Sequence, residues 1–308
     1  MSWRHRYQYR VFLRSSIWVA PILGLILALA SFRLMGVVGR YMGWHSDMNA
    51  DAARAVVSTL VSALLTFIVF ILSAILVAVQ LASAQLTSRI IARSLQERAI
   101  RASLAALVFS FTFSLAVLSR IDSMAPMVEL QVSIWSSLLC VCVVLYLVDH
   151  LAKSLRPIAI LTGVACEGAE VIRSVYPHAL EAEGEPAPSP PPAGSAAQVV
   201  THTGSSSVLL AMDLEGLLQL ARNCGVVFEI VPQVGDFVVH GADLVRIHGG
   251  TGVSPSRLRA AFALGAERTL EQDPAFALRI IVDIASKALS PAINDPTTGV
   301  LALSLIHI

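Results

Sequence analysis

The stretch from residue 55 to residue 88, AVVSTLVSALLTFIVFILSAILVAVQLASAQLTS, contains no charged side chain. As one continuous helix, these 34 residues would be about 50 Å long at 1.5 Å per residue. The hydrocarbon core of a bilayer is only about 30 Å thick. We therefore predict a membrane-spanning helix that either tilts or projects beyond the lipid on one side.

Three further apolar stretches are long enough to cross a bilayer, which takes about 20 helical residues. We predict four spans, at residues 16–35, 56–85, 102–118 and 132–148. The composition agrees, because 56% of the 308 residues are hydrophobic, only 14% are charged, and the mean hydropathy is +0.71. Soluble domains contain fewer apolar and more charged residues. The predicted fold class is an α-helical transmembrane domain of four spans, followed by a soluble α+β cytoplasmic domain.

Basic residues favour one orientation of these spans, since cytoplasmic loops are enriched in lysine and arginine. On one side the flanking basic residues are Arg4, Arg6, Arg10, Arg14, Arg89, Arg93, Arg98, Arg101, Lys153 and Arg156. The other side has only Arg33, Arg40, Arg54 and Arg120. We therefore expect a multi-pass protein of the lipid bilayer with its N- and C-termini in the cytoplasm.

The first span has an alternative interpretation as a cleaved signal peptide. Basic residues precede an apolar run that contains Ala28–Leu29–Ala30, which matches the outline of such a peptide. Cleavage would leave three spans and a charge distribution that is harder to reconcile with them. A retained first helix is the preferred interpretation.

Polar residues of the second span recur at steps of three or four residues, or of their sum, which places them on one stripe of a helix. The stripe contains Thr59, Ser62, Thr66, Ser73, Gln80 and Ser83, and continues to Thr87. One interpretation is packing, since hydroxyl groups and small residues let membrane helices approach closely and hydrogen-bond across the contact. The other is a water-filled path through an oligomer. Packing is preferred because this span has no ionisable residue, which ion and proton pathways often contain.

The sequence behind the fourth span changes to a segmented pattern. We divide the chain into a transmembrane domain (1–150), a helical connector (151–178), a proline-rich linker (179–205) and an α+β domain (206–302). Five prolines between residues 186 and 192 indicate a stiff, extended spacer.

Within the α+β domain we expect a strand near 206–212 and a helix from Asp213 to Gly225. Three strands follow within 226–249, with bends at Gly235 and Gly241, and then helices at 255–268 and 273–289. The run VGDFVVHGADLVRI at residues 234–247 resembles half of the barrel-sandwich domains that carry biotin or lipoate on a lysine in a tight hairpin. The only lysines, Lys153 and Lys287, lie outside such a hairpin, so we expect no cofactor.

Two stretches carry a resemblance to a known family. The segment LGAERTLEQDPAFALRIIVDIASKALSPAINDPTTGV at residues 264–300 and the segment LVAVQLASAQLTSRII at residues 76–91 are similar to signatures of a bacterial family of predicted membrane proteins, DUF2254. With four spans ahead of a cytoplasmic domain, the resemblance covers essentially the whole chain. It implies a protein of the bacterial cytoplasmic (inner) membrane and assigns no reaction, ligand or catalytic residue.

The first of these segments also contains the polar residues of a candidate site. They are Arg268, Gln272, Asp273, Asp283, Lys287, Asn294 and Asp295. The preferred interpretation is structural, because Asp273 and Asp295 each precede a proline and can cap the helix that the proline opens. A binding site would need these groups to meet in one cleft.

The last six residues, LSLIHI at 303–308, match the in-frame translation of a common transposon-derived sequencing adapter. We expect this hexapeptide to be an artefact and the α+β domain to be incomplete. His307 accordingly carries no functional weight.

The remaining features exclude several classes of protein. Nucleotide-binding and hydrolase motifs are absent from the sequence, and the eight histidines and four cysteines have no metal-ligand spacing. A net charge of +1 argues against nucleic acid as a partner. The leading hypothesis is a non-enzymatic, homo-oligomeric membrane protein that binds or senses a soluble ligand. The alternative is an ion channel or transporter whose second span lines the path.

Overall fold

The computed structural model describes residues 3–42, 49–85, 97–121, 127–177 and 197–307. The predicted linker up to residue 196, the stripe residue Thr87 and the basic residues Arg89 and Arg93 lie outside this description. The chain forms two compact units. We call Leu13–Ile160 the span unit, and Met1–Phe12 together with Leu161–Ile308 the sheet unit.

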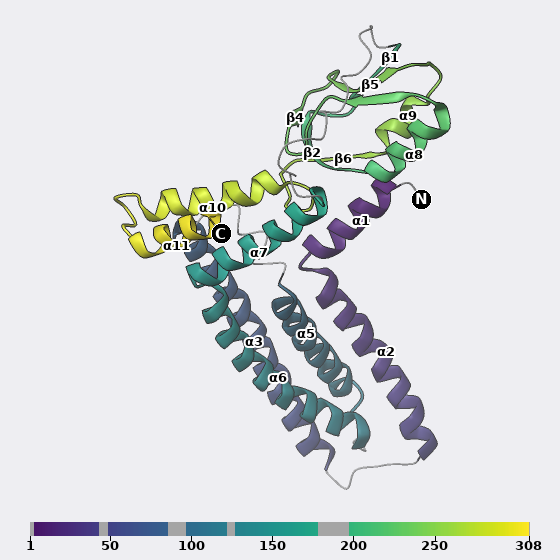
Figure 1. The fold of residues 1–308 in the computed structure, drawn as a ribbon. Helices are drawn as coiled ribbons and strands as arrows, with labels where there is room; N and C mark the ends of the chain where they lie inside the picture. Colours follow the sequence, from purple (N-terminus) through teal and green to yellow (C-terminus); the bar gives the residue numbers. More distant parts are fainter. Residues whose placement is uncertain (1–2, 43–48, 86–96, 122–126, 178–196, 308) are drawn as a thin grey trace. The chain divides into compact units, whose positions relative to one another are not determined.

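The described residues of the span unit form four long helices, α2 (Val19–Met42), α3 (Ala50–Gln85), α5 (Arg98–Leu118) and α6 (Met127–Ser154) (Figure 1). Each has the length and apolar composition of a membrane span, in the ranges Val19–Val38, Ala50–Ser83, Arg98–Leu118 and Val128–Ser154. The prediction of four candidate spans is therefore confirmed. The helices extend past most predicted ends because hydropathy marks the lipid-facing part of a helix and not its termini.

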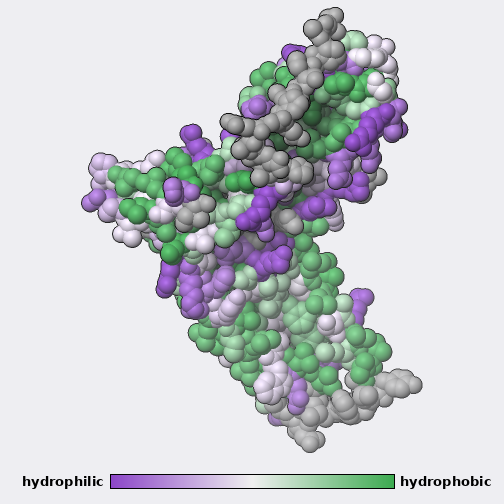
Figure 2. Space-filling model, viewed as in Figure 1, coloured by the Kyte–Doolittle hydropathy of each residue, from purple (hydrophilic) through white to green (hydrophobic). Residues whose placement is uncertain are grey.

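Helix α5 is the centre of the span unit and packs against α2, α3 and α6. Its side chains Leu107, Phe113 and Val117 are fully buried among those helices. The outward faces of the other helices are apolar, as at Trp135 and Leu145, which are 68% and 67% exposed. Figure 2 shows hydrophobic residues over much of the surface of these helices. An apolar exterior around a packed interior is what a bilayer environment requires.

The sheet unit contains two small antiparallel sheets (Figure 1). One has the order β1-β5-β3, with β1 at Gln198–Thr201, β5 at Asp243–His248 and β3 at Val227–Ile230. The other has the order β4-β2-β6, with β4 at Phe237–Val238, β2 at Ser207–Met212 and β6 at Phe262–Gly265. Their common core includes Leu209, Val245, Ile247 and Phe262, with Leu217 of helix α8 (Leu214–Cys224).

The predicted helix at 255–268 is wrong over its second half. Helix α9 (Pro255–Arg259) is short, and the chain then enters strand β6. Strand β6 pairs with β2, where Phe262 faces Met212 and Ala263 faces Ala211. Tertiary pairing of this kind overrides the helical preference of an alanine-rich stretch. Strand β1 also lies inside the segment expected to be linker, so sheet structure begins before residue 206.

Four more of the described helices belong wholly or partly to the sheet unit. They are α1 (Trp3–Ser15), α7 (Pro157–Val175), α10 (Pro274–Ala288) and α11 (Pro296–His307). Helices α10 and α11 pack together. Helix α7 approaches α10 at Gly168, where an added Cβ would lie 2.7 Å from the Cβ of Ala277. One face of α10 is buried, including Phe276, Ile280 and Ile284.

Candidate functional site

The polar stripe predicted on the second span lies mainly on the side of α3 that the described residues leave uncovered. Residues two positions apart on a helix point about 200° away from each other. Thr66 therefore lies opposite the buried Leu64, and Ser73 opposite the buried Ile71. Thr59, Ser62, Thr66, Ser73 and Gln80 are exposed, and Ser83 is half-buried.

The hydroxyl groups of this stripe donate to carbonyl groups of their own helix. The donor–acceptor distances are 2.8 Å from Thr59 Oγ1 to the Ala55 carbonyl, 2.9 Å from Thr66 Oγ1 to the Ser62 carbonyl and 2.9 Å from Ser73 Oγ to the Val69 carbonyl. Bonds of this kind satisfy the hydroxyl hydrogen within the helix. The oxygen lone pairs remain able to accept from a neighbouring helix or from water.

A second group of hydroxyls, which the sequence reasoning did not single out, lies largely buried between α5 and α6. Ser114 Oγ is 2.7 Å from Ser133 Oγ, and Ser110 Oγ is 3.0 Å from Ser136 Oγ. Serines at four-residue steps, such as 110 and 114 in α5, were the available signal. Because both partners lie within the chain, this cluster joins α5 to α6 and is a packing contact.

Three residues of the candidate tail site meet at the start of α10. Arg268 Nε donates to Asp273 Oδ2 at 2.8 Å. Gln272 bonds both backbone groups of Met212, accepting from its N–H at 2.9 Å and donating to its carbonyl at 3.2 Å. These contacts tie the end of β2 to the segment that enters α10.

The other tail residues have separate positions. Asp273 Oδ1 accepts from the Phe276 N–H at 2.9 Å, and Asp295 Oδ1 accepts from the Thr298 N–H at 3.1 Å, so both predicted helix caps are confirmed. Asn294, with a φ of 49°, is the residue before the second cap. Asp283 pairs with Arg279 at 3.3 Å, and Lys287 lies one turn further along α10. Since Asp283 follows Asp273 by ten helical positions, about 15 Å separates them along the axis. The seven residues therefore do not form one cleft.

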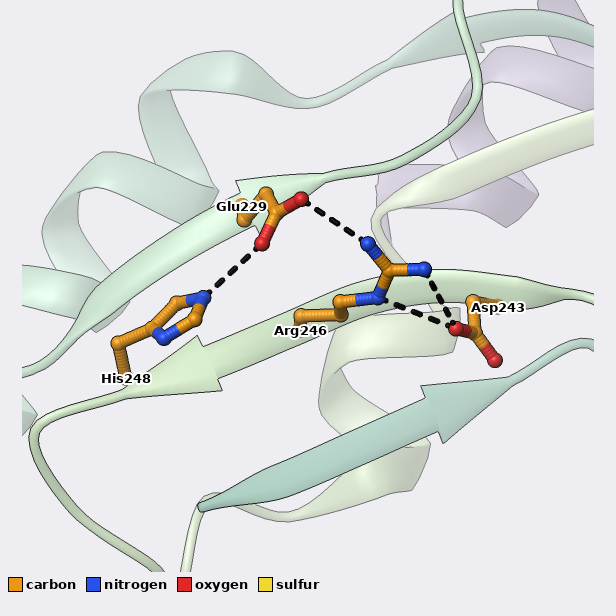
Figure 3. A network of polar contacts seen from close by, with 4 residues as sticks. All are labelled: Glu229, Asp243, Arg246 and His248. Carbon is orange, nitrogen blue, oxygen red and sulfur yellow. Dashed lines mark hydrogen bonds and ion pairs between the residues drawn. The ribbon is translucent and has the colours of Figure 1, made fainter. Parts of the chain in front are cut away.

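A network of four charged or polar side chains crosses strands β3 and β5 (Figure 3). His248 Nε2 donates to Glu229 Oε2 at 3.0 Å, and Arg246 Nη1 donates to Glu229 Oε1 at 3.1 Å. Arg246 also donates to Asp243 Oδ2 through Nε at 3.2 Å and through Nη2 at 3.1 Å. The hydrogen bond from His248, together with the neighbouring Arg246 charge, lowers the pKa of Glu229 below its ordinary value of 4.5. The three bonds of Arg246 and the bond of His248 all end on carboxylates of the same two strands, so the role of this network is to hold β3 and β5 in register.

The lowered pKa of Glu229 predicts an acid-sensitive contribution to stability. A carboxylate whose pKa is lower in the folded state stabilises the fold above its unfolded pKa, and this contribution is lost as the pH falls through the folded pKa. We expect Glu229→Gln to lower the unfolding temperature at neutral pH and to match the unsubstituted protein in acid below the pKa. Thermal unfolding followed from about pH 7 to about pH 3 checks this. Glu215→Gln, on an exposed part of α8, is the control, and a pH-independent difference would contradict the assignment.

The sheet unit also contains a polar pocket of about 360 Å³. Its walls are the loop from Thr203 to Ser207, the buried His202 and parts of β5 and β6. Two arginines also line it, Arg4 of α1 and Arg259 of α9. No carboxylate is among the described residues that line it. The sequence reasoning missed this pocket because its two arginines come from opposite ends of the chain.

The four candidate spans define a multi-span membrane protein. Most of the sheet unit follows these spans in the sequence, and this unit contains the polar pocket. The chain belongs to the family described as Predicted membrane protein (DUF2254), whose model matches residues 14–307. The resemblance identified in the sequence is thus confirmed.

Similar curated proteins come from mycobacteria. The chain is 27% identical over 315 aligned residues to Uncharacterized protein Mb1321c of Mycobacterium bovis and to Uncharacterized protein Rv1290c of Mycobacterium tuberculosis. Each alignment covers 96% of this chain and 59% of the relative. The chain therefore spans about three fifths of the length of the curated relatives that it matches. No solved structure matches it.

Proposed function

We propose that this protein is a homo-oligomeric, membrane-anchored binding module. In this proposal the four spans hold it in the bacterial cytoplasmic membrane, and the sheet unit lies in the cytoplasm and binds a small ligand without transforming it. The excess of basic residues on one side of the spans supports the orientation. The pocket of the sheet unit, within the size range of small-molecule sites, supports ligand binding.

The observation that carries the oligomer is the position of the α3 stripe. Its hydroxyl and amide groups from Thr59 to Gln80 lie opposite the face through which α3 packs in its own chain. Lipid offers these groups no hydrogen-bond donor, whereas a second α3 helix offers both donors and acceptors. Association of two or more chains through this face would give the stripe a polar partner.

Cysteine crosslinking tests this assembly. We expect Thr66→Cys and Ser73→Cys, each in a chain whose four native cysteines are replaced by alanine, to form covalent dimers in membranes under mild oxidation. Leu27→Cys, on the 59%-exposed outward face of α2, is the matched control and is expected to stay monomeric. The measurement is the dimer fraction on a non-reducing gel. Monomers at both stripe positions, or dimers only at the control, would refute association through α3.

A path for ions along α3 is the second candidate, and the exposed polar stripe is the observation that favours it. The variants Thr66→Cys and Ser73→Cys distinguish a helix contact from an ion path. In a helix contact the introduced thiols are shielded from a membrane-impermeant thiol reagent, whereas in a water-filled path they react with it. The absence of an ionisable residue from 55 to 88 favours the helix contact.

A further inference from the structure

We infer that the polar pocket of the sheet unit is a binding site for a phosphoryl group. This inference rests on the proposed binding function and specifies its ligand class. The pocket combines positive charge, hydroxyl groups and backbone amides in one concave surface, which are the groups that proteins use to hold phosphate.

Among the described residues, no carboxylate offsets the positive charge of the pocket. Arg4 and Arg259 both line it, and no carboxylate of the described chain forms an ion pair with either guanidinium. Arg259 Nε donates to the Thr201 carbonyl at 2.8 Å, which fixes the guanidinium while its two terminal nitrogens stay available. An immobilised guanidinium with two such nitrogens matches the oxygens of a phosphoryl group in a bidentate arrangement.

The loop from Thr203 to Ser206 adds hydrogen-bond donors. Two of its four carbonyl oxygens accept from histidines: His202 Nε2 donates to the Ser205 carbonyl at 2.8 Å, and His240 Nδ1 donates to the Gly204 carbonyl at 3.0 Å. By contrast, the four amide N–H groups of this loop have no acceptor within the described part of the chain. The amides without an acceptor, beside two carbonyls that are already bonded, give the loop the polarity of an anion site.

The loop can lie close to His202 because Gly204 has no side chain. A Cβ on Gly204 would lie 2.8 Å from Cε1 of the His202 ring. His202 is itself buried, and its backbone is bonded on both sides, from its N–H to the Ala242 carbonyl and from the Gly241 N–H to its own carbonyl, each at 2.8 Å. The pocket wall is therefore a built structure and not a loose surface loop.

The volume narrows the ligand class. A pocket of about 360 Å³ exceeds what free phosphate fills and lies at the lower end of small-molecule sites. A phosphomonoester with a small organic group fits both the volume and the charge. Such a group occurs in soluble metabolites and in the headgroup of phosphatidic acid, and the chemistry of recognition is the same for both.

Titration of the purified full chain distinguishes these sources. The soluble probes are inorganic phosphate and glycerol 3-phosphate, added to the protein in detergent. The lipid probe is phosphatidic acid in phosphatidylcholine nanodiscs that contain the protein, with pure phosphatidylcholine nanodiscs as the reference. Binding is followed by calorimetry for the soluble probes and by the unfolding temperature of the sheet unit for all of them. We expect saturable binding of at least one probe, with a higher unfolding temperature when the probe is in large excess over its Kd.

Three variants locate the binding. Arg259→Gln and Arg4→Gln are each expected to weaken binding about tenfold or more, because each removes a charge-assisted contact. Arg257→Gln removes the same charge from an exposed position of α9 outside the pocket and is expected to leave binding unchanged. Arg259 also bonds the backbone, so Arg4→Gln keeps the test valid should Arg259→Gln not fold.

Each outcome is decisive. Binding of glycerol 3-phosphate that depends on both arginines assigns a soluble phosphomonoester, and binding of phosphatidic acid alone with the same dependence assigns a lipid headgroup. Absence of binding to all probes, or binding that survives both arginine substitutions, overturns the phosphoryl site. If none of these probes binds but a ligand without phosphate raises the unfolding temperature of the sheet unit, the binding function stands and only its ligand class fails.

Discussion

Replacing Gly24 with leucine is expected to lower the stability of the span unit by about 3 kcal/mol, at the upper end of the usual range for overpacking. Gly24 lies in α2 where the helix meets α5, and a Cβ at this position would stand 2.5 Å from the Ala105 carbonyl oxygen. The obstacle is backbone, which is held by its own helix and does not swing aside as a side chain does. Leucine also gains about 1 kcal/mol of helix propensity over glycine, but this gain is smaller than the expected cost of the collision.

Thermal unfolding of the detergent-solubilised chain measures this effect. A loss of about 3 kcal/mol corresponds to an unfolding temperature roughly 6–12 °C lower in a unit of this size. Ala30→Leu places the same leucine side chain at an exposed position of the same helix and is expected to change stability by less than about 0.5 kcal/mol. Equal unfolding temperatures for the two variants would show that α2 and α5 do not pack through Gly24.

The spans are the part of the fold that the sequence reveals most directly, whereas the contact of Gly24 with α5 is not visible in the sequence. In lipid each backbone group must be bonded inside its own helix, so composition over about 20 residues is enough to identify a span. Which faces meet is not a local property. Nothing in the sequence around Gly24 identifies Ala105 as its neighbour, and the close approach becomes visible only when the helices are packed.

The same distinction separates the elements of the sheet unit that could be predicted from those that could not. Helix α8 was predicted with its ends, because Asp213 caps it and Gly225 terminates it with a φ of 64°. These are local signals. Strand β6 is four residues long and pairs with β2, which lies some fifty residues earlier in the chain. Strand β1 likewise depends on β5, so its own four residues carry too little information to distinguish it from linker.

The candidate sites follow the same rule. The α3 stripe was predictable because its residues share one helix, and periodicity alone aligns them. The seven tail residues were grouped because they are close in sequence, although α10 separates Asp273 from Asp283 and Asn294 in space. The polar pocket was missed for the opposite reason, since Arg4 and Arg259 are brought together only by the fold of the sheet unit.

Replacing Asp273 with alanine is expected to have the largest effect in the sheet unit. Asp273 is only 2% exposed and has two functions at once. Its Oδ2 pairs with Arg268 Nη2 at 2.6 Å, and its Oδ1 caps α10 through the Phe276 N–H at 2.9 Å. The backbone of Gly235 packs directly against this ion pair, because a Cβ at this position would lie 2.5 Å from Asp273 Oδ2.

Breaking a buried ion pair typically costs 3–5 kcal/mol, and losing a helix cap costs about 1 kcal/mol. The side chain of Arg268 is 35% exposed, so water recovers part of its charge once the partner is removed, and the lower end of about 3 kcal/mol applies. Arg268 also lies 5.1 Å from the centre of the Phe276 ring, a contact that survives the substitution.

Hydrogen exchange in α10 measures this cost locally. A loss of about 3 kcal/mol corresponds to amide exchange roughly 100-fold faster across Pro274–Ala288, since each 1.4 kcal/mol is a factor of ten. Asp273→Asn keeps an oxygen for the cap and loses the charge, so it separates the two functions and is expected to fall between alanine and the unsubstituted chain. Asp283→Asn weakens a pair whose arginine is 63% exposed and is expected to change exchange by about fivefold or less. If Asp273→Ala and Asp283→Asn accelerated exchange equally, burial would give the Asp273 ion pair no advantage over the exposed pair of Asp283. The start of α10 would then be stabilised by its apolar face alone.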